Sequence, residues 1–326
     1  MMDKLIGSFT KQINEAMEIG AAAKLIQPTK AVRNVVVCGL GGSGIGCDLV
    51  INLVHDKLLV PMVTCKEYVL PEYVDKHTVL FIVSYSGNTE ETLHMFKEGI
   101  DRNAKIVCIA SGGSLLKLAQ KAGIDYITIP SGLPPRACLA YSFIQQLYIL
   151  DRYHLINNAF TLGLEEAIDF LDGSEKKIRK EAQRVAKKLK GKMPVIYAAP
   201  SMSAVALRFR QQLNENAKVL AWHNVIPEMN HNELVGWTAP GKYAVVMLRN
   251  ESDYERIQHR MEINKKIISK YAKTIIELYC QGDSLIAQEL YMIHLLDWVS
   301  YYLAELRKVD AMEVKVIDYL KAELAN

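Results

Sequence analysis

The chain has no excess of charge of either sign. Its 39 Lys and Arg side chains are matched by 36 Asp and Glu, a formal net charge of +3 over 326 residues. This balance gives no electrostatic reason to expect binding to nucleic acid or to a membrane surface. The 19 glycines and 10 prolines are too few for a collagen-like or linker-dominated chain, and a hydrophobic fraction of 50% excludes a disordered one.

Long hydrophobic runs and cysteine motifs are also missing. The longest apolar runs, such as residues 78–83, are far too short to cross a bilayer. The N-terminal residues contain neither an apolar core nor a small-residue cleavage site, so we expect no signal peptide. None of the six cysteines forms a Cys-x-x-Cys pair, and Cys38 and Cys108 stand inside apolar runs. Free buried thiols in a reducing cytoplasm are therefore expected, rather than a disulfide framework or a zinc site.

Short β-branched runs alternate with helical segments along the chain. In the first half the predicted strands are residues 34–38, 60–65, 78–83, 105–110 and 126–129, and the predicted helices cover the opening stretch to about residue 24 and residues 45–54, 90–100, 115–122 and 137–155. Continuous apolar strands that alternate with helices favour a parallel sheet covered on both faces.

The pattern repeats more loosely in the second half. The predicted strands are residues 193–198, 219–222, 243–248 and 274–279, and the predicted helices are residues 175–189, 203–213, 254–270, 284–306 and 312–324. Residues 156–175 break the pattern. We therefore expect an α/β fold of two domains, residues 1–155 and 156–326, each with a mainly parallel sheet flanked by helices in a flavodoxin-like three-layer arrangement.

The first half carries a glycine-rich segment after its first strand. Residues 39–44 fit the pattern G-x-G-x-x-G, and a glycine loop before a helix allows backbone N–H groups to approach an anion. The motif alone leaves three possibilities open: a dinucleotide site, a phosphate site and a tight turn without a ligand. It is not a P-loop, because no Gly-Lys-Ser/Thr follows.

A second polar loop, residues 84–91, follows the strand at 78–83. Ser84, Ser86 and Thr89 place three hydroxyls around a glycine at the start of a helix, which suits a phosphate monoester. The loop could also be an ordinary capped turn, with Thr89 as the cap and Glu91 compensating the helix dipole. Both loops follow strands of one predicted sheet, at the edge where open α/β sheets bind ligands. Together they predict a phosphate site.

Five motifs occur in order between residues 39 and 233: GLGGSGIGCD, VSYSGNTEETL, PSGLPPRA, LNENAK and NHNE. In this set and order the chain resembles the bifunctional phosphoglucose/phosphomannose isomerase family, which is built from two sugar isomerase (SIS) domains. The resemblance implies an aldose–ketose isomerase that works through an enediolate, in a cytoplasmic homodimer with shared active sites, without a metal ion or another cofactor. The phosphate would be held by Ser43, Ser84, Ser86 and Thr89, with Gly42 and Gly44 in the substrate-binding loop.

The resemblance also implies the catalytic groups. Glu215 would be the base that moves a proton between C1 and C2, and His231, supplied by the neighbouring subunit, would open the sugar ring. Arg136 would stand near the enediolate. Lys321 would lie near the phosphate or the ring oxygen, with Lys315 as its competitor. Without the resemblance each of these residues could equally be a surface side chain at a helix end or in a polar loop.

One segment departs from the family pattern. The family usually has Asp-Pro before its final helix, whereas residues 309–313 read VDAME, without proline. Glucose 6-phosphate is therefore a firmer expectation than mannose 6-phosphate.

Three other functions fit parts of the sequence. A dinucleotide-dependent oxidoreductase would use residues 39–44 with Glu67, but would leave the serine loop without a role. A non-catalytic sugar-phosphate sensor would normally carry a DNA-binding module, and no such segment precedes residue 34. A metal-dependent isomerase would draw on a ligand set whose spacing matches no established motif: His223, Glu228, His231 and Glu233.

Overall fold

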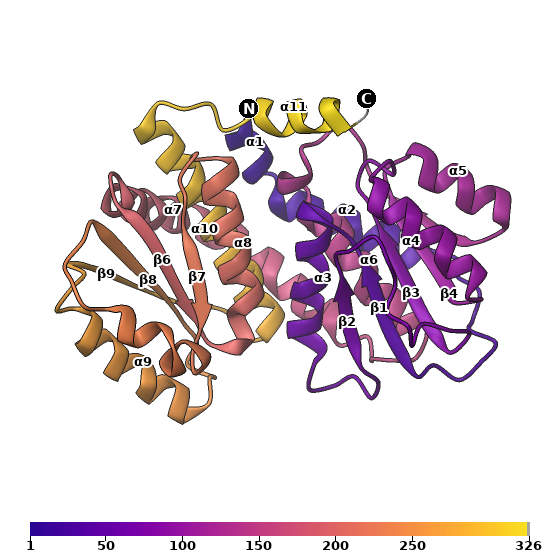
Figure 1. Cartoon of the computed structure of the whole chain (residues 1–326), viewed down its shortest axis with the longest axis horizontal. Coiled ribbons are helices and arrows are strands. Elements are labelled where there is room, and N and C mark those ends of the chain that lie inside the picture. The colour runs from indigo at the N-terminus through magenta and orange to yellow at the C-terminus, as the bar shows by residue number, and fades with distance from the viewer. Residues whose placement is uncertain (325–326) are drawn as a thin grey trace. The chain divides into compact units, whose positions relative to one another are not determined.

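The computed structural model describes residues 1–324 and divides the chain into two compact units. One unit consists of residues 8–169 together with 284–286, and we call it the N-unit. The other consists of residues 1–7, 170–283 and 287 onward, and we call it the C-unit. Each unit is an α/β structure, and strands of both sheets can be followed in Figure 1.

The N-unit contains a five-stranded sheet in which every pair of neighbouring strands is parallel. Its strands are β1 (Asn34–Cys38), β2 (Met62–Cys65), β3 (Thr78–Val83), β4 (Lys105–Ala110) and β5 (Asp125–Thr128), in the spatial order β2-β1-β3-β4-β5. All six residues of β3 are buried, as expected for a central strand covered on both faces. This strand order is that of the flavodoxin-like fold.

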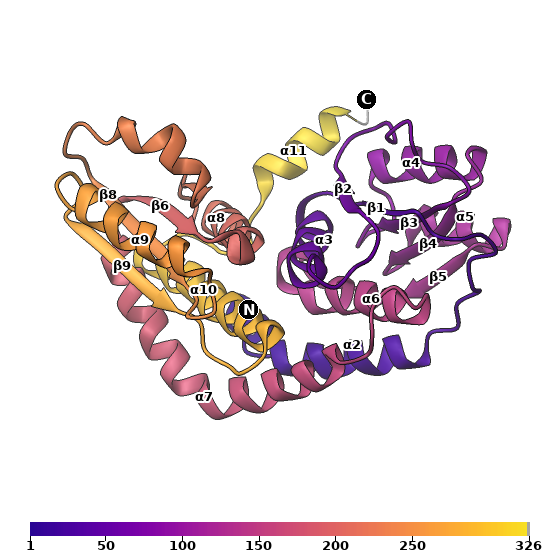
Figure 2. The same cartoon turned by 90° about the horizontal axis from the view of Figure 1, so that it is seen from below.

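Helices cover both faces of this sheet. The bounds are α2 (Phe9–Ala22), α3 (Gly41–Val54), α4 (Glu90–Asp101), α5 (Gly113–Ala122), the 3-10 helix η1 (Pro135–Ala137) and α6 (Leu139–Arg152). Figure 2 shows α4 and α5 on one side of the sheet and α2 and α6 on the other. Met95 and Phe96 of α4 and Leu115 of α5 are buried in the core cluster on the first side.

The C-unit contains a four-stranded parallel sheet in the order β7-β6-β8-β9. Its strands are β6 (Met193–Ala198), β7 (Trp222–Val225), β8 (Tyr243–Arg249) and β9 (Thr274–Tyr279). Its helices are α1 (Met2–Ile6), η2 (Pro200–Met202), α8 (Ser203–Glu215), η3 (Glu228–His231), η4 (Glu233–Gly236), α9 (Glu255–Ile268) and α11 (Lys315–Leu324). Two long helices, α7 (Phe160–Leu189) and α10 (Leu285–Arg307), contribute residues to both units.

The division between the units differs from the one expected at residues 155 and 156. Residues 156–175 looked like a break, but α7 runs without interruption from Phe160 to Leu189, and the compact units divide inside it, after Asp169. Gly163 does not interrupt the helix. A Cβ at this position would stand 2.2 Å from the Ile286 side chain, so the glycine serves close packing rather than a turn.

The other differences between the predicted and the observed bounds of helices and strands are small, with one exception. Strands 34–38, 78–83, 105–110, 193–198 and 274–279 have the predicted bounds, whereas the strand expected at 219–222 is β7, three residues later. The exception is the glycine segment. The sequence predicted a loop to Gly44 and a helix from Ile45, but α3 already begins at Gly41.

Glu289 of α10 is fully buried, and neither of its carboxylate oxygens has a hydrogen-bond partner within residues 1–324. Burial raises the pKa of this carboxyl well above its ordinary value, because the charged form loses its hydration. The unfolded chain releases this proton above about pH 4.3. Between about pH 4.3 and the raised pKa of the folded state, the unfolded chain loses this proton while the folded chain keeps it. The free energy of unfolding therefore falls as the pH rises through this range.

We expect Glu289→Gln to become progressively more stable than the wild type as the pH rises from about 5 to about 8, because glutamine has no proton to lose. The difference in the free energy of unfolding between the variant and the wild type should grow by up to about 1.4 kcal/mol per pH unit, as long as the pH is below the pKa of Glu289 in the folded state. Thermal unfolding at both pH values measures it, and Glu305→Gln, at an exposed position of the same helix, is the control. An equal pH dependence in the two variants would contradict the expectation.

Candidate functional site

Strands β1 and β3 are neighbours in the N-unit sheet. From β1 the chain continues to β2 on one side, and from β3 it continues to β4 on the other. The glycine segment follows β1, and the serine loop, residues 84–89, follows β3. In the order β2-β1-β3-β4-β5 the boundary between β1 and β3 is the topological switch point, where open α/β sheets bind their ligands at the carboxyl ends of the strands. The structure therefore places both predicted loops at the expected binding edge.

The glycine segment forms the first turn of α3, and two of its glycines are required by close packing. A Cβ on Gly44 would stand 2.5 Å from the carbonyl oxygen of Gly39. A Cβ on Gly42 would stand 3.0 Å from the backbone of Pro135, so the turn packs directly on the segment that carries Arg136. The buried Ser43 follows within the same turn. Its hydroxyl lies at the N-terminus of α3, where the helix dipole favours an anion.

The serine loop is held in shape by its own hydroxyl groups. The Ser84 and Thr89 hydroxyls are 2.9 Å apart, and the Gly87 N–H donates to the Ser84 Oγ at 3.2 Å. The Asn88 N–H donates to the Ser86 Oγ, also at 3.2 Å. Gly87 has a φ of +68°, and a Cβ there would overlap the carbonyl oxygen of Gly112. Ser84 is buried and Ser86 is exposed, so the two serines differ in their access to a ligand.

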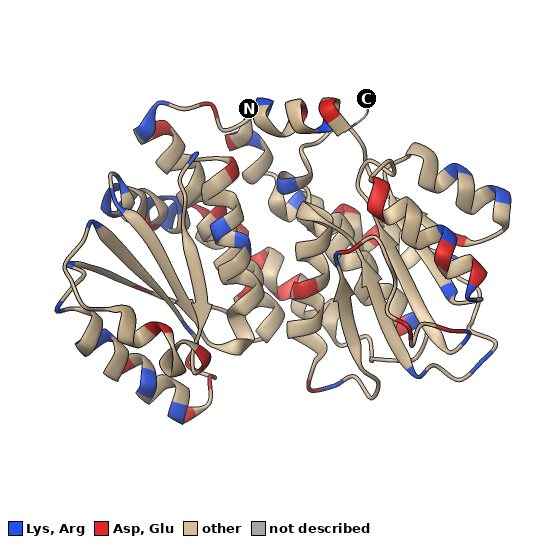
Figure 3. Cartoon of the chain, in the orientation of Figure 1, with Lys and Arg blue, Asp and Glu red and all other residues tan. Residues whose placement is uncertain are grey.

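Thr89 stands at the N-cap of α4 but makes no side-chain capping bond, because its hydroxyl pairs with Ser84 instead. The first N–H groups of a helix have no partner within it. Glu90 and Glu91 occupy the first turn, where Figure 3 shows the red of acidic residues at the start of α4. These carboxylates complement the helix dipole. An anion at this point would be bound by hydroxyl and N–H donors rather than by lysine.

Tyr85 was not predicted as a site residue, but it connects the surrounding loops. Its backbone N–H donates to the Ser43 Oγ at 3.1 Å, and its carbonyl accepts from the Ser111 hydroxyl at 2.6 Å. Its phenol oxygen accepts the Leu133 N–H at 2.9 Å. One residue thus joins the glycine turn, the loop after β4 and the loop that leads to Arg136. A tyrosine between two serines was the only local signal.

Arg136 lies in η1, directly after Pro134 and Pro135. It is 5% exposed, so its long side chain is packed into the N-unit rather than extended into solvent. The surface-arginine interpretation of the sequence is therefore wrong. The packing of Pro135 on Gly42 brings the backbone of this segment against the glycine turn.

A lysine beside the glycine turn was also missed. Lys66, the residue after β2, pairs with Asp48 of α3 at 2.5 Å, and Asp48 also accepts the Thr64 hydroxyl at 2.8 Å. The Cε of Lys66 lies 3.3 Å from where a Cβ of Gly44 would stand. The ammonium group therefore lies near the N-terminus of α3, a position that no local pattern in the sequence indicates.

Glu215 is the last residue of α8 and is half-buried. The helix that carries it is fixed to α10 by buried polar side chains spaced four residues apart. Arg208 and Gln212 both bind the carboxylate of Asp297, at 2.7 and 2.8 Å. Asn216 binds the Ser300 hydroxyl at 2.9 Å. Residues four apart share one face of a helix, so this face of α8 is anchored from Arg208 to its C-terminal end.

The side chains of the asparagines beside Glu215 fix the end of α8. Asn214 donates to the Val219 carbonyl at 2.7 Å, and Asn216 donates to the Ser300 hydroxyl. Lys218, with a φ of +55°, donates to the carbonyl of Glu215 at 2.5 Å. The end of the helix is thus fixed, and the side chain of Glu215 is positioned through its backbone.

His231 is exposed at the end of η3. The segment that carries it is anchored by Glu233, whose carboxylate accepts three hydrogen bonds, from the Tyr197 hydroxyl, from Trp222 Nε1 at 3.0 Å and from Asn224 Nδ2 at 2.6 Å. Burial, and then the bond to Glu233, raise the pKa of Tyr197. Glu233 is therefore a structural anchor with its oxygens occupied, which makes it a poor candidate for a base or a metal ligand.

Lys321 and Lys315 both belong to α11 and are both exposed. The helix begins three residues later than predicted. Without the family's proline, its start is formed by Asp310, which accepts the Met312 N–H at 2.8 Å, and by Glu313, which accepts the Lys315 N–H. The backbone N–H of Lys315 is therefore bonded to the Glu313 carboxylate at the start of α11.

The structure gathers part of the predicted site within one unit. Ser43 lies in the first turn of α3, and Ser84, Ser86 and Thr89 lie in the adjoining serine loop of the N-unit; the Arg136 segment packs on the turn of α3. Glu215, His231 and Lys321 lie on three different elements of the C-unit. Within residues 1–324 there is no group of three or more His, Cys, Asp and Glu residues placed to bind a metal ion. None of the helices in this range combines the length and apolar character needed to cross a membrane.

Comparisons with known proteins agree with the motifs. Residues 178–324 match the family model of the bacterial phospho-glucose isomerase C-terminal SIS domain. The C-terminal domain of glucosamine-fructose-6-phosphate aminotransferase from Francisella tularensis has a similar fold, with a TM-score of 0.76 over 95% of this chain and 96% of that one at 14% identity. The two-SIS-domain α/β fold predicted from the sequence is thereby confirmed.

Two curated relatives cover nearly the whole chain. The bifunctional phosphoglucose/phosphomannose isomerase of Caldicellulosiruptor bescii is 39% identical over 100% of this chain and 99% of its own length. That of Aquifex aeolicus is 37% identical over 90% of each chain. The resemblance predicted from five motifs is confirmed over the full length: the chain belongs to the bifunctional phosphoglucose/phosphomannose isomerase family.

Proposed function

We propose that the protein interconverts glucose 6-phosphate and mannose 6-phosphate with fructose 6-phosphate. The observation that carries this proposal is the joined glycine turn and serine loop at the switch point of the N-unit sheet, in a chain of this family. Both aldoses lose the stereochemistry of C2 in the same 1,2-enediolate, so one set of acid–base groups can serve both substrates. Assays of both reactions with purified protein test the proposal. Conversion of neither sugar phosphate would overturn it.

The phosphate is bound by Ser86, Thr89 and Ser43, with Ser84 holding the loop in shape. The exposed Ser86 accepts the Asn88 N–H, which leaves its own proton to donate to a phosphate oxygen. Hydrogen bonds to a charged acceptor are about twice as strong as those between neutral groups. The N-termini of α3 and α4 add their dipoles.

The chemistry follows from the remaining residues. His231 takes a proton from the anomeric hydroxyl and returns one to the ring oxygen, which opens the ring. Glu215 removes the proton from C2 and delivers it to C1, so that no net proton is gained or lost. The guanidinium of Arg136 and the ammonium of Lys321 stabilise the negative charge that develops on the enediolate oxygens. No step requires a metal ion.

The active unit is a homodimer in which His231 is supplied by the partner chain. His231 is exposed, and the segment that carries it is anchored by the carboxylate of Glu233. Both observations support a role for His231 outside its own unit.

Hybrid dimers test the shared site. Glu215→Gln and His231→Ala homodimers should each be inactive, but mixing them should restore activity, because one site of each hybrid then contains both native residues. The assay is performed after subunit exchange has been verified with differently tagged chains. Verified hybrids without activity, or a fully active monomer in sedimentation, would refute the shared site.

Ser86→Ala should weaken sugar-phosphate binding by about 1–3 kcal/mol, because it removes one charge-assisted hydrogen bond. The effect should appear in the affinity for a sugar phosphate measured by calorimetry, with a smaller effect on turnover. Ser114→Ala is a suitable control, since only the backbone N–H of Ser114 contacts the serine loop, through Asn88. Unchanged affinity in Ser86→Ala would exclude Ser86 from phosphate binding.

A further inference from the structure

Two cysteines lie side by side directly before the elements of the phosphate site. Cys38 is the last residue of β1 and Cys65 the last residue of β2, and they are paired in register across the parallel ladder. Both belong to the same core cluster, so their side chains are on the same face of the sheet. Nothing in the proposed isomerase chemistry uses either thiol.

The geometry of this pair is compatible with a disulfide. Neighbouring strands are about 4.8 Å apart, within the range of about 4.4–6.8 Å that disulfides span between Cα atoms. Each thiol shifts the pKa of the other, as expected for two neighbouring side chains on one face of the sheet. A bond between them requires the ends of β1 and β2 to approach slightly.

The two thiols differ in reactivity. The hydrogen bond from Cys38 lowers the pKa of Cys65 to about 7, whereas the same bond and burial raise the pKa of Cys38. Burial also raises the pKa of Cys47 and of Cys108. Since the thiolate is the nucleophile, Cys65 is the reactive member of the pair, and Cys38, its register partner on the neighbouring strand, is the resolving thiol.

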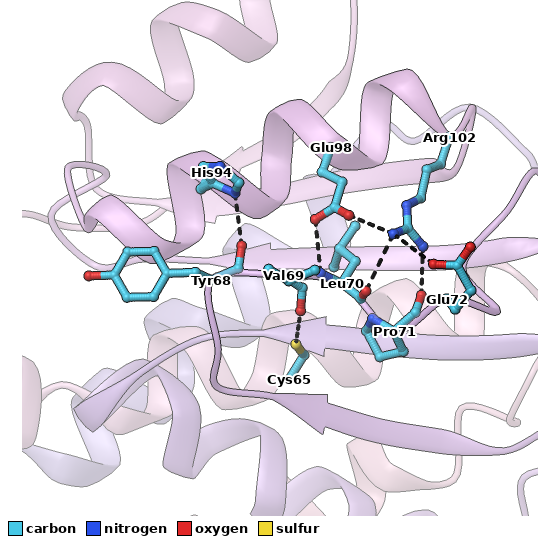
Figure 4. A network of polar contacts seen from close by, with 9 residues as sticks. All are labelled: Cys65, Tyr68, Val69, Leu70, Pro71, Glu72, His94, Glu98 and Arg102. Carbon is cyan, nitrogen blue, oxygen red and sulfur yellow. Dashed lines mark hydrogen bonds and ion pairs between the residues drawn. The ribbon is translucent and has the colours of Figure 1, made fainter.

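The segment after Cys65 does not depend on its thiol for support. The sulfur points to the Val69 carbonyl at 3.5 Å, a weak contact, as Figure 4 shows. Helix α4 holds the same segment through stronger bonds. His94 donates to the Tyr68 carbonyl at 2.8 Å, and Glu98 accepts the Leu70 N–H at 2.9 Å. Cys65 can therefore change its bonding without releasing this segment.

We propose that Cys38 and Cys65 form a reversible dithiol–disulfide site, oxidised by hydrogen peroxide, whose disulfide form binds phosphate more weakly. The link to phosphate rests on the proposed function. A disulfide brings the two Cβ atoms to about 3.8 Å, which draws the ends of β1 and β2 together. This movement is transmitted to Gly39, whose N–H donates to the Cys65 carbonyl at 3.4 Å, and to Lys66 beside the glycine turn.

The reaction is balanced without another reagent. The Cys65 thiolate attacks one peroxide oxygen, the O–O bond breaks, and hydroxide leaves and is protonated to water, which leaves a sulfenic acid on Cys65. The sulfur of Cys38 then attacks this sulfur, loses its proton and displaces the second oxygen as water. Two thiols are oxidised to one disulfide, and one peroxide is reduced to two water molecules. A small dithiol reductant reverses the change.

Intact-mass analysis of the full-length protein tests the site independently of catalysis. Peroxide should lower the mass by about 2 Da, the loss of two hydrogens, and peptide mapping should locate the bond between Cys38 and Cys65. Cys38→Ala should instead trap a sulfenic acid on Cys65 that dimedone labels, whereas Cys65→Ala should leave Cys38 unmodified. Cys108→Ala, a buried thiol of the same core cluster, is the matched control and should oxidise like the wild type.

Calorimetry with inorganic phosphate tests the coupling. The oxidised wild type should bind phosphate about fivefold or more weakly than the reduced protein, and reductant should restore the affinity. Cys65→Ala should bind equally before and after peroxide. A bond between any other pair of cysteines, no bond at all, or equal phosphate affinity in the two states would overturn the proposal. Neither the mass analysis nor the phosphate calorimetry requires turnover. A protein without isomerase activity would therefore contradict the proposed function but not the disulfide site.

Discussion

Glu215→Gln should lower turnover by about 10² or more, the usual effect of removing a positioned acid–base group. Glutamine keeps the shape of the side chain, and the hydrogen bonds that fix the end of α8 come from the side chains of Lys218, Asn214 and Asn216. The variant should therefore fold normally. The proposed phosphate site lies in the N-unit, so the affinity for a sugar phosphate should change little.

Isotope exchange distinguishes loss of the base from a general disturbance. In deuterated water the Glu215→Gln variant should no longer incorporate deuterium at C1 or C2 of the substrate. Glu228→Gln is the matched control, because Glu228 is exposed and lies on the His231 segment. Exchange at the wild-type rate in Glu215→Gln would remove Glu215 from the mechanism. Glu228 would then be the next candidate, since the carboxylate of Glu233 is already occupied by three donors.

Asp297→Ala should destabilise the fold by about 3–5 kcal/mol, the usual cost of breaking a buried ion pair. Arg208 and Gln212 are 4% and 2% exposed, and both lose the Asp297 carboxylate as an acceptor in this variant. The buried guanidinium would be left without its carboxylate, a larger penalty than the lost hydrogen bonds alone. Chemical denaturation followed by circular dichroism measures the free energy of unfolding.

A surface ion pair provides the control for Asp297. Glu262 pairs with Arg249, but its side chain is 45% exposed, and Arg249 retains a second partner in Glu277. Glu262→Ala should therefore cost no more than about 1 kcal/mol. A loss in Asp297→Ala no larger than in this control would mean that the anchoring of α8, and with it the placement of Glu215, does not depend on Asp297.

Local sequence pattern was sufficient for the elements that carry the site. Strands 34–38, 78–83 and 105–110 were predicted with their observed bounds, because continuous β-branched runs between polar or glycine-containing segments are a short-range signal. The position of the glycine and serine loops at one edge then followed from the parallel order of the strands. The five motifs identified the family, and the full-length relatives confirmed it.

The interactions that position the site depend instead on residues distant in sequence. The sequence by itself determined which segments are strands, where the anion loops lie and which family the chain belongs to. Only the tertiary structure showed that Gly41–Gly44 is a helical turn, that Tyr85 joins three loops, that Glu233 is an anchor rather than a ligand and that Cys38 stands beside Cys65. The physical reason is that each of these features requires two or more segments to meet at hydrogen-bonding or van der Waals distance. Such pairings leave no periodic signal in any one segment.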